Sequence, residues 1–206
     1  MTFVKVCGIT RLEDVMHAVR CGATAVGFVF WPGSPRYVAP EVAAGMIGAL
    51  PSDVTPVGVF VNQSVEEVDR VARRAGVTTI QLHGEEPASY ATALGRTVLK
   101  ATSLAGAEAV FASWPDDTLI LLDAHDPVRR GGTGQVVDWT RAAVLAARRR
   151  VVLAGGLTPD NVQEAIAAVD PFGVDVSSGV EASPGIKDVN KMARFFEQVR
   201  ASSNGR

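Results

Sequence analysis

The sequence has little cysteine: only Cys7 and Cys21 occur in 206 residues. Two cysteines cannot form the disulfide framework of a small secreted protein, and they lack the neighbouring ligands of a structural zinc site. A chain of this length also buries enough apolar surface to fold without covalent cross-links. We therefore expect a protein of a reducing compartment, the cytoplasm, with no metal bound.

Long hydrophobic runs and an excess of one charge are missing as well. Apolar runs such as 119–122 have the length of a β-strand and are far too short to span a bilayer. Lys5 and Arg11 interrupt the apolar start of the chain, so it does not resemble a signal peptide. The 20 basic and 22 acidic residues give a net charge of −2, which offers no general attraction for nucleic acid or anionic lipid. We expect neither as a partner.

Short apolar runs alternate with amphipathic segments along the whole chain. This alternation is typical of repeated strand-helix units around a parallel sheet. It predicts strands near 3–7, 24–30, 56–61, 77–82, 97–101, 118–123, 150–154 and 172–176. It predicts helices near 11–21, 40–49, 64–75, 87–94, 105–113, 138–148, 159–168 and 187–200.

About eight such units in a chain of this size favour a single-domain (β/α)8 TIM barrel over residues 1–200. A doubly wound open sheet with fewer strands is the competing topology. The sequence has no Gly-x-Gly-x-x-Gly after its first predicted strand and no Walker-type Gly-Lys-Ser/Thr, so no motif indicates a dinucleotide or P-loop site. Residues 201–206, rich in Ser, Asn and Gly, are predicted to form a frayed tail.

Polar residues gather at the ends of the predicted strands, where barrels of this kind hold their reactive groups. Taken singly, each has an ordinary structural explanation: a small buried thiol, a core histidine or a turn glycine. Their shared position is what indicates a site. The residues are Cys7, Gln81, His83, Asp123, Gly155, Gly156, Asp175, Ser177, Ser178 and Gly179.

The glycine pair Gly155–Gly156 and the segment Ser177–Ser178–Gly179 follow the last two predicted strands. Barrels commonly bind phosphate at this place with backbone N–H groups, and glycine lets the backbone approach an oxyanion closely. Because two adjacent strands end in this way, we predict a phosphate-binding site formed by both segments.

Asp123 and Cys7 are the candidate proton-transfer groups. Asp123 ends a strongly apolar strand, where an acid must be paired or must face the barrel mouth. Cys7 alternates with Lys5 on one face of the first strand, and a cation near a thiol favours the thiolate. A buried Lys5 needs an acidic partner. The candidates are Asp175 and Asp123, and Asp175 is favoured because the eighth strand adjoins the first on closure.

Arg36 lies in a stiff, Pro- and Gly-rich loop, 31–37, after the second predicted strand. Its guanidinium suits a carboxylate, although an ordinary surface arginine is the alternative explanation. The segment 129–134, after the sixth strand, has the composition of a loop that folds over a ligand. The basic run 148–150 is interpreted as a solvated helix end.

With these residues assembled, the chain resembles the phosphoribosylanthranilate isomerase family from end to end. The resemblance is carried by several motifs in one order, and a single one of them would be weak. The motifs include KVCGIT at 5–10, GFVFWPGSPRYV at 27–38, QLHGEE at 81–86, LAGGLTPDNV at 153–162, DVSSGVE at 175–181 and PGIKD at 184–188.

The resemblance implies an Amadori rearrangement of N-(5-phosphoribosyl)anthranilate, a step of tryptophan biosynthesis, by acid/base catalysis without a cofactor. It assigns Cys7 as general base, Asp123 as general acid and Arg36 as the partner of the anthranilate carboxylate. Gln81 and His83 match positions near the substrate, as we also expect for Asp175. The phosphate-binding segments of the family match those predicted above. A monomer or a homodimer is expected.

Two other functions would use part of the same set of residues. Another phosphate-binding barrel enzyme, such as indole-glycerol-phosphate synthase, would share the phosphate site but carry a different acid/base set, and KVCGIT argues against it. A non-catalytic phospholigand-binding barrel would need the phosphate site but neither Cys7 nor Asp123. Replacing either residue distinguishes an enzyme from a sensor.

Overall fold

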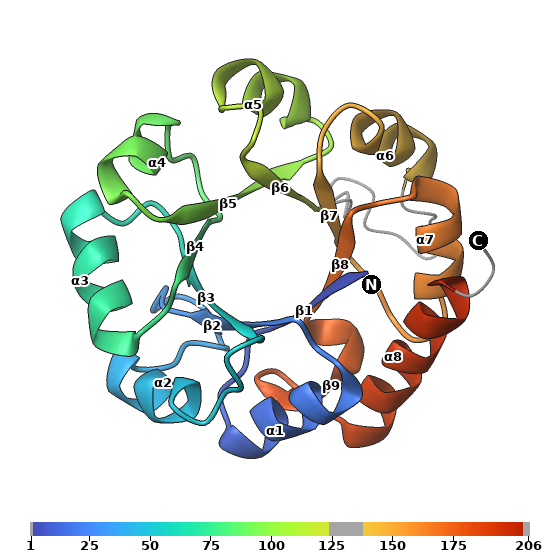
Figure 1. Cartoon of the computed structure of the whole chain (residues 1–206), viewed down its shortest axis with the longest axis horizontal. Helices are drawn as coiled ribbons and strands as arrows, with labels where there is room; N and C mark the ends of the chain where they lie inside the picture. Colours follow the sequence, from blue (N-terminus) through green and yellow to red (C-terminus); the bar gives the residue numbers. More distant parts are fainter. Residues whose placement is uncertain (1, 124–137, 204–206) are drawn as a thin grey trace.

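The computed structural model describes residues 2–123 and 138–203. Eight parallel strands follow one another around a closed barrel, and β8 pairs with β1 to complete it. Figure 1 looks along the barrel axis and shows the helices as an outer ring around the strands. Closure confirms the predicted (β/α)8 barrel and excludes the open, doubly wound sheet.

Every predicted strand and helix overlaps an observed one, with bounds that differ by at most three residues. The strands are β1 (Phe3–Cys7), β2 (Ala25–Val29), β3 (Thr55–Phe60), β4 (Thr79–Leu82), β5 (Thr97–Ser103), β6 (Leu119–Asp123), β7 (Val151–Ala154) and β8 (Gly173–Val176). The helices are α1 (Leu12–Cys21), α2 (Pro40–Ile47), α3 (Val65–Ala75), α4 (Ser89–Leu94), α5 (Ala107–Ser113), α6 (Trp139–Ala146), α7 (Val162–Val169) and α8 (Val189–Ser203).

The segment between β8 and α8 holds structure that the pattern did not predict. A 3₁₀ turn, η2 (Ser178–Val180), is followed by the antiparallel strands β9 (Glu181–Ser183) and β10 (Ile186–Lys187). Pieces of two or three residues are too short to give a periodic signal. This small hairpin carries Glu181 and Lys187, which contact Arg36 and the backbone of Cys7 at the barrel mouth.

The predicted tail 201–206 requires a correction at its start. Helix α8 continues through Ser203, so residues 201–203 are helical. The hydroxyl of Ser202 donates a hydrogen bond of 2.9 Å to the carbonyl oxygen of Gln198, one turn earlier. A serine that bonds to its own helix in this way fits the last turn, although composition alone suggested a frayed end.

The pleat of the closed sheet sorts side chains into two apolar layers. One layer fills the space between the strands and the helices, and the other lies inside the barrel, where it includes Leu99, Leu121 and Val152. Alternate residues of each strand therefore face the interior, as in other barrels of this kind. Within the described parts of the chain, no helix is both long and apolar enough to cross a membrane.

A buried ion pair lies between the sheet and the helices near the end of β4. Lys100 Nζ lies 2.9 Å from Glu86 Oε2, and the two side chains are 4% and 1% exposed. The ammonium also donates to the carbonyl oxygens of Gly84 and Leu82. Glu86 in turn accepts hydrogen bonds from the backbone N–H groups of Asn62 and Gly84. The pair thus links the loops after β3 and β4 to strand β5.

Glu86→Ala is expected to lower the free energy of unfolding by about 3 kcal/mol, because it leaves the Lys100 ammonium buried without its counter-ion. Urea unfolding of the variant and the wild type measures this difference. The control is Glu108→Ala, which removes an exposed ion pair with Arg148 and should change the stability little. Equal losses in the two variants would contradict the structural role of the buried pair.

Candidate active site

A cavity of about 490 Å³ opens at the carboxyl ends of the barrel strands. Its volume falls in the range of small-molecule sites, roughly 300–1,000 Å³. Every residue predicted from the sequence as a site residue lines this one cavity. They are Cys7, Arg36, Gln81, His83, Asp123, Gly155, Gly156, Asp175, Ser177, Ser178 and Gly179.

Lys5 lies below the cavity and is fully buried. Its Nζ is 2.9 Å from Asp175 Oδ1, and the two residues face each other in the register of β1 and β8. This confirms Asp175, and not Asp123, as the predicted partner. Burial lowers the pKa of Lys5, but the charge of Asp175 and the nearby Cys7 outweigh it, so the pKa is raised above its ordinary value.

Gly27 makes room for Cys7 and Lys5 to share the barrel interior. A Cβ atom at Gly27 would lie 3.0 Å from Cys7 Sγ and 3.1 Å from Lys5 Nζ. The thiol and the ammonium therefore both pack over the bare backbone of the neighbouring strand β2. Any side chain there would have to displace one of them.

Gln81 and His83 follow each other on the inner face at the end of β4. The Gln81 amide nitrogen lies 2.8 Å from His83 Nδ1. An amide N–H₂ can only donate, so Nδ1 accepts, and a neutral ring carries its proton on Nε2. The Gln81 carbonyl oxygen is buried and has no hydrogen-bond partner among the described residues. It is the natural acceptor for a hydroxyl or amine of a bound molecule.

Burial lowers the pKa of His83 below its ordinary value of 6.5, and the positive charge of Lys5 acts in the same direction. The negative charge of Asp123 opposes this shift without cancelling it. His83 is therefore a neutral hydrogen-bonding group near pH 7. Asp123 itself is half-buried at the end of β6 and lines the same cavity as Cys7.

The predicted phosphate-binding segments lie side by side at the ends of β7 and β8. Gly155 and Gly156 have φ angles of 88° and 69°, a conformation that favours glycine. The Asn161 side chain braces this turn: it donates to the carbonyl oxygen of Gly156 and accepts from the backbone N–H of Thr158. Gly179 packs so closely against the carbonyl oxygen of Leu157 that no Cβ fits between them. The two segments therefore form one wall of the cavity.

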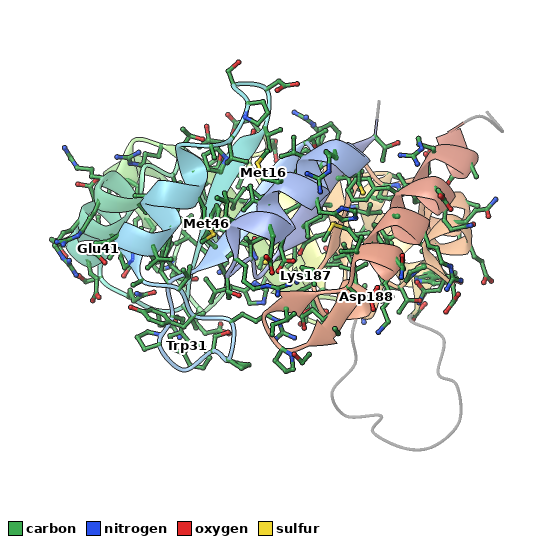
Figure 2. All side chains as sticks on the ribbon, turned by 90° about the horizontal axis from the view of Figure 1, so that it is seen from below. Met16, Trp31, Glu41, Met46, Lys187 and Asp188 are labelled. Carbon is green, nitrogen blue, oxygen red and sulfur yellow. The ribbon has the colours of Figure 1, made fainter. Side chains whose placement is uncertain are left out.

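Arg36 lines the cavity from the loop after β2. Its Nε and Nη2 donate hydrogen bonds of 2.8 and 2.7 Å to the two carboxylate oxygens of Glu181, on β9. These hydrogen bonds raise the pKa of Arg36 above its ordinary value. Trp31, on the same loop, lies at the rim of the cavity with 42% of its surface exposed. Figure 2 shows the Trp31 loop protruding beyond the barrel edge.

Two kinds of residue at this site were not predicted from the sequence. Glu181 and Lys187 lie in the DVSSGVE and PGIKD motifs, but nothing in their spacing indicates that Glu181 contacts Arg36 or that Lys187 contacts Glu181. The second group is the apolar lining, which completes the walls between the polar groups. It consists of Val29, Trp31, Val59, Val61, Leu121, Ala154 and Leu157. Period-two alternation on the strands was the available signal for the strand members of this group.

A second cavity, of about 550 Å³, lies over β5 and α5. It shares His83 and Asp123 with the first cavity but contains neither Cys7 nor the phosphate-binding segments. The first cavity is therefore the candidate active site. The predicted ligand-covering segment 129–134 lies outside the described residues.

Comparison with known proteins identifies the family of this chain. A family model described as N-(5'phosphoribosyl)anthranilate (PRA) isomerase matches residues 4–198. The chain belongs to this family. It is 49% identical over 205 residues to N-(5'-phosphoribosyl)anthranilate isomerase of Geobacter sp. strain M21, an alignment that covers 98% of this chain and 100% of the relative.

Solved structures of the family have the same fold. Phosphoribosyl anthranilate isomerase from Thermotoga maritima superimposes with a TM-score of 0.90 at 42% identity, over 98% of this chain and 100% of the other. A second structure, of a family member in complex with reduced 1-(o-carboxyphenylamino)-1-deoxyribulose 5-phosphate, gives a TM-score of 0.87 at 40% identity, with the same coverage. Membership of the family confirms the resemblance seen in the sequence motifs.

The imidazole of His83 is expected to titrate below pH 6.5, because burial disfavours its charged form. Between pH 6.5 and the lower folded-state pKa, the unfolded chain binds more protons at this residue than the folded protein. Its contribution to stability is thus present above pH 6.5 and is lost as the pH falls through this window. NMR titration of the ring, assigned with a His83→Gln variant, measures the pKa. A midpoint at or above 6.5 would contradict the buried, neutral imidazole.

Proposed function

We propose that this chain isomerises N-(5'-phosphoribosyl)anthranilate to 1-(2-carboxyphenylamino)-1-deoxyribulose 5-phosphate, an aldose-to-ketose rearrangement of tryptophan biosynthesis. The observation that carries the proposal is one cavity lined by a thiol, a carboxyl group, an arginine and two glycine-rich strand ends. These groups match the chemistry of a substrate with a phosphate at one end and a benzoate at the other. The reduced product bound in a family member supports the same substrate class.

The phosphate end and the benzoate end of the substrate are assigned to different residues of the cavity lining. The backbone of Gly155–Gly156 and Ser177–Gly179 binds the phosphate, because N–H groups in such turns are suited to an oxyanion. Arg36 binds the anthranilate carboxylate through a charge-assisted hydrogen bond. The apolar lining packs against the aromatic ring. Gln81 offers a substrate hydroxyl its carbonyl oxygen, which has no partner among the residues that the structure describes.

The rearrangement needs one acid and one base. Asp123 donates a proton to the furanose ring oxygen while the anthranilate nitrogen assists ring opening, which gives a Schiff base. Cys7, as the thiolate, then removes the proton from C2, and the resulting enolamine tautomerises to the ketone. The Lys5 ammonium lies beside the sulfur, so a positive charge is placed next to the proposed base. His83 stays neutral and donates a hydrogen bond.

The proposed reaction also bears on the cofactors, location and partners of the enzyme. The reaction is an internal transfer of protons, so it needs no cofactor or metal, and the substrate is a small phosphorylated molecule. We propose a cytoplasmic enzyme that acts as a monomer or a homodimer, without nucleic acid or membrane partners. One relative, from Thermotoga maritima, is described as dimeric.

The wild-type protein is expected to convert N-(5'-phosphoribosyl)anthranilate, and Cys7→Ser or Asp123→Asn to lower kcat by at least about 10², the usual value of a positioned proton-transfer group. The fluorescence of the substrate's anthranilate group follows the reaction. Both variants should still bind the reduced product.

The matched control for Cys7→Ser is Cys21→Ser, which replaces the half-buried thiol of α1, outside the cavity. It should retain wild-type kcat. Absence of turnover by the wild type would reject the proposed function, and near-normal kcat in either variant would reject that residue's role.

Arg36→Met is expected to raise KM with little change in kcat, because it removes the partner of the anthranilate carboxylate but leaves the acid and the base in place. A charge-assisted hydrogen bond contributes roughly 1.5–3 kcal/mol, equivalent to a KM increase of about 10- to 150-fold. Steady-state kinetics with the natural substrate test this. If neither KM nor kcat changes, Arg36 does not bind the substrate and is an ordinary loop residue.

A further inference from the structure

Glu181 and Lys187 form a buried ion pair behind the wall of the cavity. Lys187 Nζ lies 2.9 Å from Glu181 Oε1, and the two side chains are 0% and 5% exposed. Neither residue belongs to the lining of the cavity. Both come from the small β9–β10 hairpin, whose Lys187 is labelled in Figure 2.

Each member of the pair contacts groups that do line the cavity. Lys187 Nζ donates to the backbone carbonyl oxygens of Cys7, at 2.6 Å, and Ser177, at 3.2 Å. Glu181 accepts both hydrogen bonds of the Arg36 fork. One ammonium and one carboxylate therefore join the proposed base, a phosphate-binding segment and the proposed carboxylate partner.

The Glu181 carboxylate fixes how Arg36 can meet a ligand. A guanidinium is planar, so two parallel hydrogen bonds from one edge set the orientation of the whole group. The pair uses Nε and Nη2, and Nη1 takes no part in it. The Arg36 side chain is 24% exposed, so its outer edge remains accessible from the cavity. A ligand carboxylate would meet a rigid donor at one position.

The carboxylate is charged in this environment. Burial alone would raise the pKa of Glu181, but the hydrogen bonds from Arg36 and Lys187 outweigh burial and hold its pKa below the ordinary value. Two cations thus share one anion, and one of them, Arg36, lines the cavity. This charge balance suits an anionic ligand.

We propose that Glu181 is a positioning residue that makes the site selective for a carboxylate-bearing substrate by holding Arg36, with Lys187 anchoring Glu181 to the ends of β1 and β8. The inference rests on the proposed function, because it gives Arg36 the anthranilate carboxylate as its ligand. Glu181 acts on the substrate only through Arg36, because it does not line the cavity itself.

The test measures binding of two ligands by isothermal titration calorimetry. One is reduced 1-(o-carboxyphenylamino)-1-deoxyribulose 5-phosphate, and the other is the same compound without its carboxyl group. Glu181→Gln keeps the size of the side chain but removes its charge. We expect it to weaken binding of the carboxylated ligand by about 10-fold, as for loss of one charge-assisted contact. Binding of the other ligand should change by less than about 2-fold.

A double-mutant cycle separates positioning from a general structural effect. In the Arg36→Met background, Glu181→Gln should cause no further loss for the carboxylated ligand. The matched control is Glu108→Gln, which disrupts a second two-hydrogen-bond Arg–Glu pair, with Arg148 on the outer surface. This control should bind both ligands like the wild type.

Equal loss for the two ligands, or full additivity with Arg36→Met, would overturn the proposal. If Glu181→Gln does not fold, Glu181→Asp replaces it, because aspartate keeps the charge beside Lys187 but is too short to hold both ends of the Arg36 fork. The same carboxylate-selective loss is then expected. Turnover by the wild type is measured in parallel, so failure of the proposed function is seen separately from failure of this inference.

Discussion

The rest of the structure depends on the rule that a charge inside the barrel must have a partner in the same layer. Lys5 is fully buried, and the closing register of β1 and β8 puts Asp175 directly beside it. An isolated lysine at this depth would either lose its proton or destabilise the fold by several kcal/mol. The pair therefore links the fold to the site, because the cation it holds lies next to Cys7.

Two other buried lysines near the barrel mouth also pair with a carboxylate. Lys187 and Lys100 are also buried, and each combines one carboxylate with backbone carbonyl oxygens from strand ends. In each case, a long flexible side chain fastens loops that come from distant parts of the sequence. The Lys187 contacts reach Cys7 and Ser177, which line the cavity, so they hold the loops and the reactive groups in place together.

The sequence predicts much of this molecule, and the limit has a physical cause. Alternating apolar patterns identify all the strands and helices of the barrel, and closure then makes neighbours of the first and last strands, so the Lys5–Asp175 pair could be predicted. Glu181 could not, because its partner Arg36 lies in an irregular loop 145 residues away. Loop-to-loop contacts follow no periodicity, so only the folded chain reveals them.

Closure between the ends of the chain also affects how this protein can be made. The partner of Lys5 lies 170 residues further along, so during synthesis the first strand emerges long before the strand that neutralises it. The ring of strands cannot close until β8, which carries Asp175, has left the ribosome. Until then, the Lys5 ammonium lacks the carboxylate that faces it in the closed barrel.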